Sequence, residues 1–179
     1  MVYPTDTLYG LGGDFFNSAV HRRIDALKGR LGQAYSVALW DLEAVERLAA
    51  PLPRWYHQHA HQVFPGPFTL VFPASPSIDP LLLKGKGTIA IRIPSQPFPL
   101  SALAEIRIPL ITTSVNRSGS VPIADPQEIL DRFPGIDLLI DAGPLPASKG
   151  STILDLSDSP PTILRRGEGM ERLTDLGIH

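Results

Sequence analysis

The chain has 179 residues, of which 43% are hydrophobic, with 16 basic residues, 18 acidic residues and no cysteine. This composition fits one folded domain and excludes an intrinsically disordered chain, a disulfide framework, a cysteine-ligated metal site and thiol catalysis. A net charge of -2 also disfavours a general binder of long nucleic acids, because such binders normally present a basic surface to the phosphates.

Membrane and export signals are missing from the sequence. No apolar run approaches the ~18 residues that a membrane span requires. The N-terminus has no charged segment followed by an apolar one, which a signal peptide would need. We therefore expect a cytoplasmic protein with no membrane partner.

Capping residues and apolar spacing predict several helices. Asn17 or Ser18 can cap a helix that continues to about Leu27, and Asp41 can cap the next one. Asp125, followed by a proline and by a glutamate three residues after the cap, is typical of a third helix start. The predicted helices span residues 17–27, 41–48, 54–63 and 125–133.

Short β-branched or apolar runs, many of them ending at a proline, predict the strands. The predicted strands span residues 1–3, 35–40, 68–72, 88–93, 109–113, 136–140, 152–156 and 162–164. Helices interleaved with strands predict an α/β, or mixed α+β, domain built on a single sheet. The short spacing after residue 135 indicates that some strands pair in antiparallel fashion.

Polar residues gather at the ends of these predicted strands. Thr5, Asp6 and Thr7 follow the first strand and precede three glycines, which would let the backbone approach a ligand closely. A turn capped by threonine and aspartate side chains explains the same residues equally well. The run 112–119 follows a strand of buried type, where α/β sheets commonly bind ligands, although an ordinary polar loop is also possible.

Cationic residues lie in or beside these loops. Lys28 and Arg30 follow a predicted helix, where a helix C-terminus also favours positive charge. Arg92 stands in an otherwise apolar strand and therefore needs a partner, either a structural carboxylate or a ligand anion. Arg165 follows the last predicted strand. A locally positive cleft in a slightly acidic protein favours a small polyanion, and a nucleotide is the natural candidate.

Motifs spread along nearly the whole chain resemble those of one known family. Pro4–Leu11 resembles the PTDTxYGL opening of YrdC-like proteins, and Lys28-Gly29-Arg30 resembles their KxR motif. Five further matches follow in the same order and at similar spacing, at residues 64–70, 89–94, 114–119, 151–155 and 163–167. Each motif alone is weak, but the ordered series is highly specific.

The chain therefore resembles L-threonylcarbamoyladenylate synthases. This resemblance implies a YrdC-like single domain over residues 1–179, with a twisted open sheet of parallel and antiparallel strands around a positive cavity. It implies a nucleotidyltransferase that makes threonylcarbamoyl-AMP and pyrophosphate from L-threonine, bicarbonate and ATP. The product would serve the tRNA threonylcarbamoyltransferase machinery that modifies tRNAs reading ANN codons.

The resemblance also implies roles for particular residues. Those expected to hold ATP are Lys28, Arg30, Thr88, Ser114, Asn116 and Arg165, and Lys28, Arg30, Ser114 and Asn116 would form the catalytic group. Those expected to hold L-threonine are Thr7, Arg92 and Ser151, with Arg92 pairing its carboxylate. Mg²⁺ would arrive with ATP, so no permanent protein metal site is expected.

The sequence departs from the family pattern in two places. Only three residues precede the PTDT motif, so we expect the N-terminal edge strand to be truncated. Ala34 and Leu39 stand where some family members carry side chains that contact threonine. The amino-acid specificity therefore needs a direct test.

Two other functions are compatible with the same motifs. The YrdC-like domain of a hydrogenase-maturation carbamoyltransferase accompanies cysteine-containing segments, and this chain has no cysteine. The second is a non-catalytic module that binds tRNA or double-stranded RNA, or assists ribosome assembly. The net charge of -2, the KxR motif, and Ser114 and Asn116 of the match at 114–119 favour catalysis over that role.

Overall fold

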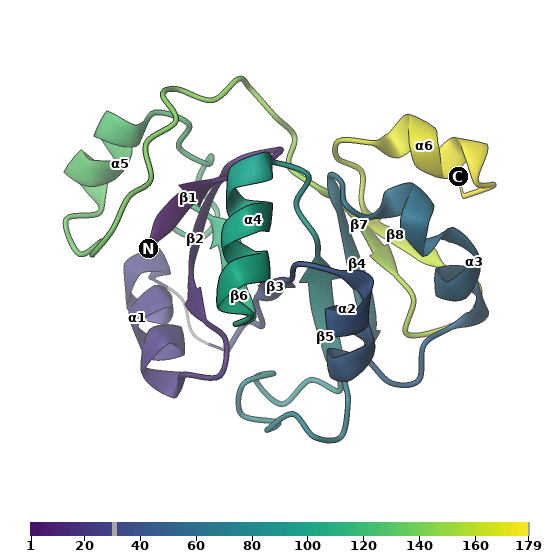
Figure 1. Cartoon of the computed structure of the whole chain (residues 1–179). Coiled ribbons are helices and arrows are strands. Elements are labelled where there is room, and N and C mark those ends of the chain that lie inside the picture. The colour runs from purple at the N-terminus through teal and green to yellow at the C-terminus, as the bar shows by residue number, and fades with distance from the viewer. Residues whose placement is uncertain (30–31, 179) are drawn as a thin grey trace.

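A mixed eight-stranded sheet forms the frame of the molecule in the computed structural model, which describes residues 1–29 and 32–178 (Figure 1). Its spatial order is β1-β2-β6-β3-β5-β4-β7-β8. The pairs β3/β5 and β4/β7 are parallel, and the other neighbouring pairs are antiparallel. The predicted open sheet with both kinds of pairing is thus confirmed. The strands are β1 Val2–Pro4, β2 Tyr9–Asp14, β3 Ser36–Ala38, β4 Phe68–Pro73, β5 Thr88–Arg92, β6 Leu110–Ser114, β7 Thr152–Asp155 and β8 Thr162–Arg165.

Helices flank this sheet, with α4 and α2 in front of it in Figure 1, α1 and α5 at one side, and α3 and α6 at the other. The helices are α1 Ser18–Lys28, α2 Leu42–Leu48, α3 Arg54–Val63, α4 Pro97–Ile106, α5 Pro126–Arg132 and α6 Met170–Asp175. The predicted caps are confirmed, since the side chains of Asn17, Asp41 and Asp125 accept hydrogen bonds from the first turns of α1, α2 and α5. No helix in the described part of the chain is long and apolar enough to cross a membrane.

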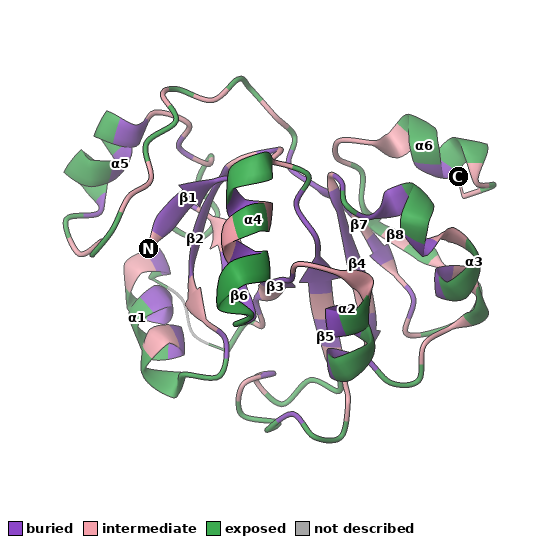
Figure 2. Cartoon of the chain, in the orientation of Figure 1, coloured by how far each residue is buried: buried purple, intermediate pink, exposed green. Residues whose placement is uncertain are grey.

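The main core lies where the central strands meet their helices. Val37, Ile91 and Ile111 come from three adjacent strands and are completely buried. Buried positions, purple in Figure 2, make up much of the sheet. Burying such side chains stabilises each by about 1.5–3 kcal/mol relative to exposure. This packing fixes the central strands, so the polar side chains at their ends are held by a rigid frame.

Helix α4 was not predicted: its segment contains Pro97 and Pro99, and proline is typical of strand ends and turns. Both prolines lie in its first turn, where a helix loses no internal hydrogen bond to a missing N–H. Its Leu103 is buried with Ala38 and Leu110 in a second, smaller apolar cluster. The short helix α6 was missed as well.

The prediction of a strand at residues 136–140 is wrong. Only Leu139 makes a bridge, to Val2, and the flanking residues add two backbone hydrogen bonds to the same strand. The apolar pattern arises because Ile136 and Leu139 pack against the main core. This segment covers the outer edge of β1, with the Val2 N–H donating to Leu138 at 2.7 Å.

The glycines after the PTDT motif belong to strand β2, which was predicted as a loop or turn. A side chain at Gly12 would place its Cβ 2.0 Å from the carbonyl oxygen of Ile111. A Cβ at Gly10 would lie 3.3 Å from the ring of Tyr3. These glycines therefore let the protein's own strands and the Tyr3 ring approach β2, although Gly10 also lines the pocket described below.

Candidate active site

A cavity of about 130 Å³ opens between the β1–β2 turn, the start of β7 and the end of β8. Its lining is rich in hydroxyl groups, contributed by Thr5, Thr7, Thr69, Thr112, Ser114 and Ser151. Drug-sized ligands usually occupy about 300–1,000 Å³, so this cavity suits a small polar molecule rather than a whole nucleotide.

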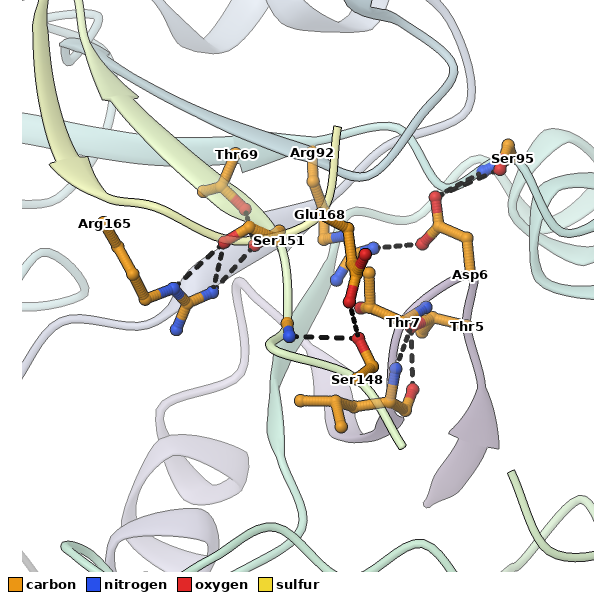
Figure 3. Close-up of polar contacts among 12 residues, drawn as sticks. Thr5, Asp6, Thr7, Thr69, Arg92, Ser95, Ser148, Ser151, Arg165 and Glu168 are labelled. Carbon is orange, nitrogen blue, oxygen red and sulfur yellow. Dashed lines mark hydrogen bonds and ion pairs between the residues drawn. The ribbon is translucent and has the colours of Figure 1, made fainter. Parts of the chain in front are cut away.

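Arg92 ends strand β5 and is only 7% exposed. Its Nη2 atom donates to Oδ1 of Asp6, whose other oxygen accepts from the backbone N–H and hydroxyl of Ser95 at 3.2 and 3.1 Å (Figure 3). The Nε atom of Arg92 is buried without a hydrogen-bond partner among the described residues. Asp6 therefore orients the guanidinium and leaves a buried donor available beside the cavity.

A second guanidinium lies in the wall of the same cavity. Nε and Nη2 of Arg165 donate to the carbonyl oxygen of Ser151 at 3.0 and 2.8 Å, and Nη2 also donates to the Ser151 hydroxyl at 2.9 Å. The Ser151 hydroxyl shares a further 2.8 Å hydrogen bond with the hydroxyl of Thr69 (Figure 3). Arg165 thereby joins the end of β8 to the start of β7.

The two arginines make the cavity electropositive. Burial lowers the pKa of Arg165, and the positive charge of Arg92 lowers it further. Asp6 is the carboxylate that neutralises Arg92, and no carboxylate within the described ranges forms an ion pair with Arg165. Binding an anion between these arginines would relieve their mutual repulsion, so the cavity favours a carboxylate or phosphate.

The PTDT turn forms the opposite wall. The hydroxyl of Thr5 donates to the carbonyl oxygen of Leu8 at 2.7 Å and accepts from the Thr7 backbone N–H at 3.3 Å. Thr7 is 4% exposed, and its hydroxyl lies 3.3 Å from that of Thr5. The turn explanation and the ligand explanation of this motif are thus compatible, because threonines that close the turn also face the cavity.

Glu168 holds the loop that leads into Ser151. Its carboxylate accepts from the Ser148 hydroxyl at 3.0 Å (Figure 3). It also accepts from the Lys149 backbone N–H at 3.0 Å. The Lys149 bond, followed by the Ser148 bond, lowers the pKa of Glu168. A charged acceptor at this point fixes the loop before it reaches the cavity.

Buried Lys28 forms a network with Ser114 and Asn116, which lie 86 and 88 residues later in the chain. The Lys28 ammonium donates to the carbonyl oxygens of Ser114 and Asn116 at 2.6 and 3.2 Å and to Oδ1 of Asn116 at 2.9 Å. The Ser114 hydroxyl donates to the same Oδ1 at 2.7 Å. Ser114 also lines the cavity, so this network adjoins it.

The remaining predicted site residues do not all come to the cavity. Arg30 lies outside the described residues. Thr88 begins strand β5 and is paired with Pro73, whereas Arg92 ends that strand. Four residue steps of about 3.3 Å separate the two ends, and Thr88 does not line the cavity. Ala90 and Thr112 both pair with Ser36, so Thr88 lies level with Ser114 across the sheet.

Sequence reasoning missed several residues that build the site. Asp6 was noted in the PTDT motif, but nothing in the sequence pairs it with Arg92, which lies 86 residues later. Tyr35 also lines the cavity, and its only sequence signal is a hydroxyl next to an apolar strand, which is too common to be selective. Thr69 and Thr112 line it as well; they fall within the motif at 64–70 and the polar run 112–119, but neither was predicted as a site residue.

The described residues contain no cluster of side chains suited to holding a metal ion. In residues 1–29 and 32–178, no three histidine, aspartate or glutamate side chains gather in a way that could hold a metal ion. The site geometry is therefore described by its arginines, its hydroxyls and the Lys28 network.

A family model described as "Telomere recombination" (Sua5, YciO and YrdC proteins) matches residues 1–167. The threonylcarbamoyl-AMP synthases of Pyrococcus abyssi and Bacillus subtilis are each 31% identical over 93% of this chain. The chain spans only about half the length of those relatives, 50% and 49% respectively. The synthase of Methylobacillus flagellatus is 32% identical, and the alignment covers 87% of each protein.

Solved structures give the same result. The crystal structure of Pyrococcus abyssi Sua5 complexed with L-threonine superposes with a TM-score of 0.90 at 30% identity, covering 99% of this chain and 54% of that one. Escherichia coli YciO superposes with a TM-score of 0.85 at 29% identity, covering 94% and 82%. Sequence motifs, sheet topology and these comparisons agree: the chain belongs to the Sua5/YciO/YrdC family.

Proposed function

We propose that the chain is an L-threonylcarbamoyladenylate synthase, a nucleotidyltransferase that converts L-threonine, bicarbonate and ATP into threonylcarbamoyl-AMP, pyrophosphate and water. The observation that carries this proposal is the small electropositive cavity containing Arg92 beside the Lys28–Ser114–Asn116 network. The names of the curated relatives and the threonine bound to Pyrococcus abyssi Sua5 support it.

The amino-acid substrate fits the cavity by its chemistry. The unpartnered Nε of Arg92 can donate to the threonine carboxylate while Asp6 keeps the guanidinium in place. The hydroxyls of Thr7 and Ser151 line the same space and can bind the polar groups of threonine. The size of about 130 Å³ admits an amino acid and leaves ATP outside, across the Ser114 side of the opening.

The reaction needs positioning and charge neutralisation. The threonine amine and bicarbonate form a carbamate with loss of water, and a carbamate oxygen then attacks the α-phosphorus of ATP while pyrophosphate leaves. Lys28, Arg30, Ser114 and Asn116 are assigned to ATP, with Arg165 between the two substrates. Mg²⁺ enters with ATP as part of the substrate. Cations around the phosphates offset the charge that develops during the transfer.

The direct test is product formation. The protein is incubated with ATP, Mg²⁺, bicarbonate and L-threonine, and threonylcarbamoyl-AMP and pyrophosphate are measured by mass spectrometry. An adduct that requires both threonine and bicarbonate, and that L-serine does not replace, supports the proposal. A folded protein that makes no adduct but binds double-stranded RNA in a strongly salt-dependent manner would support the RNA-binding function instead.

A further inference from the structure

A buried carboxylate on α1 lies outside the polar network described above. Asp25 is only 4% exposed. Its Oδ1 atom accepts a 2.6 Å hydrogen bond from the Tyr35 hydroxyl, and its Oδ2 atom accepts one of 2.7 Å from the Lys84 ammonium. A buried carboxylate requires partners of this kind. Asp25 thereby joins the helix to two segments that lie 10 and 59 residues further along the chain.

Tyr35 connects this carboxylate to the cavity. It is 6% exposed and forms part of the cavity wall together with Ala34 and Ser36. Because Asp25 holds the hydroxyl, Tyr35 cannot move away from the wall without breaking a charge-assisted hydrogen bond. The position of Tyr35 therefore depends on a residue that does not itself line the cavity.

Lys84 connects Asp25 to the loop between β4 and β5, residues 74–87. This loop projects at the bottom of Figure 1. The Lys84 backbone has φ 53°, in the left-handed region that residues other than glycine seldom adopt. Its side chain is 17% exposed and reaches inward to Asp25. The ion pair thus fixes the loop to α1 at a point where the backbone conformation is unfavourable by itself.

The last turn of α1 carries two buried charged side chains, those of Asp25 and Lys28. Asp25 and Lys28 are three residues apart and both are buried, so they share a face of the helix. Lys28 holds the Ser114–Asn116 loop, while Asp25 holds Tyr35 and Lys84. One helix turn therefore anchors Tyr35 and Ser114, two residues that line the cavity.

We propose that Asp25 is a positioning residue for the amino-acid substrate: it fixes Tyr35 as a wall of the cavity, and Lys84 compensates its charge. The cavity wall at Tyr35 then sets the affinity for threonine, whereas ATP binding does not depend on it. This inference rests on the proposed function, because it assigns the cavity to the amino acid.

Three variants test whether Asp25 acts on threonine binding through Tyr35. Tyr35→Phe removes only the hydroxyl, Asp25→Ala removes the acceptor, and Asp25→Asn keeps an acceptor for Tyr35. We expect Tyr35→Phe and Asp25→Ala each to raise the KM for L-threonine about 5- to 10-fold, with the KM for ATP unchanged. Asp25→Asn should restore most of the threonine affinity, and the double variant Asp25→Ala/Tyr35→Phe should be no worse than the more affected single variant.

A matched control breaks an ion pair away from the cavity. Arg47 and Glu43 form an exposed pair on α2, and Arg47→Gln should leave the KM for threonine unchanged. An unchanged KM for threonine in both Tyr35→Phe and Asp25→Ala, measured on an active wild type, overturns the inference and leaves the proposed function standing. Equal changes in the KM values for threonine and ATP also overturn it.

Hydrogen exchange distinguishes failure of the inference from failure of the proposed function. The exchange of backbone amides in residues 32–38 is measured without substrates in the wild type, Asp25→Ala and Asp25→Asn. Faster exchange in Asp25→Ala, restored in Asp25→Asn, supports positioning by Asp25 even if the wild type makes no threonylcarbamoyl-AMP. Identical exchange in all three proteins overturns it.

Discussion

The Nζ atom of Lys28 donates a 2.6 Å hydrogen bond to the carbonyl oxygen of Ser114, which lies 86 residues later in the chain. Lys28 is 2% exposed, and its ammonium also bonds both oxygens of Asn116. The KxR lysine therefore has a structural task in addition to any contact with phosphate. It holds the end of β6 and the following loop in the shape that borders the cavity.

Replacing this lysine should consequently affect both stability and catalysis. Lys28→Met leaves buried carbonyl oxygens without donors, and we expect a loss of about 1–3 kcal/mol in the free energy of unfolding. Adenylate formation should be almost abolished, because the positive charge and the Ser114–Asn116 geometry are lost together. Urea unfolding and pyrophosphate release measure the two effects.

Lys86→Met is the control for that variant, since Lys86 is exposed in the β4–β5 loop. It should change neither measurement appreciably. Wild-type pyrophosphate release by folded Lys28→Met would remove Lys28 from the catalytic group.

Arg92 should determine the affinity for the threonine carboxylate. Arg92→Lys keeps the charge but cannot bond Asp6 and a substrate carboxylate with the same fork geometry. Loss of one charge-assisted hydrogen bond, about 1.5–3 kcal/mol, corresponds to an increase of about 10- to 100-fold in the Kd for threonine. Isothermal titration calorimetry measures this Kd, and Arg54→Gln on the exposed face of α3 is the control. Unaltered threonine binding by Arg92→Lys would refute the assignment.

Replacing Thr88 and replacing Ser114 should change the KM for ATP to different extents, although both residues were predicted to contact ATP. Thr88 lies level with Ser114 across the sheet, but it does not line the cavity and no hydrogen bond described for the Lys28–Ser114–Asn116 network includes it, so Thr88→Val should leave the KM for ATP within about twofold. Ser114→Ala removes the hydroxyl that donates to Asn116 and should raise that KM clearly. Steady-state kinetics with varied ATP compare them, and a large effect of Thr88→Val would restore Thr88 to the nucleotide site.

Acid should loosen the loop that Glu168 holds. The Lys149 and Ser148 hydrogen bonds lower the pKa of Glu168 below its ordinary value of 4.5. The carboxylate's contribution is therefore present above that value and is lost as the pH falls through the lower, folded-state pKa. We expect threonine affinity to decline as the pH is lowered below about 4.5.

Glu168→Gln isolates that contribution. It removes the charge, so threonine should bind more weakly at neutral pH, and the part of the acid decline due to Glu168 should disappear. Calorimetric titrations from neutral pH to about pH 3.5 compare the two proteins. Superimposable pH profiles would show that Glu168 does not control the cavity.

Local patterns in the sequence determined much of the fold. Asn17, Asp41 and Asp125 cap their helices because their side chains bond the nearest backbone N–H groups, which is a short-range interaction. The apolar runs of β4, β5 and β6 were predicted because buried strands need such residues. The motif resemblance also selected Thr7, Arg92, Ser114, Ser151 and Arg165, all of which line the cavity.

Only the tertiary structure decided which distant groups meet. Strand β2 and the segment 136–140 were misassigned because pairing across the sheet, rather than local pattern, decides whether a segment becomes a strand. The Asp6–Arg92 and Asp25–Lys84 ion pairs join residues 86 and 59 positions apart. Composition and spacing carry no information on such pairs, since each depends on how the whole sheet brings its strand ends and loops together.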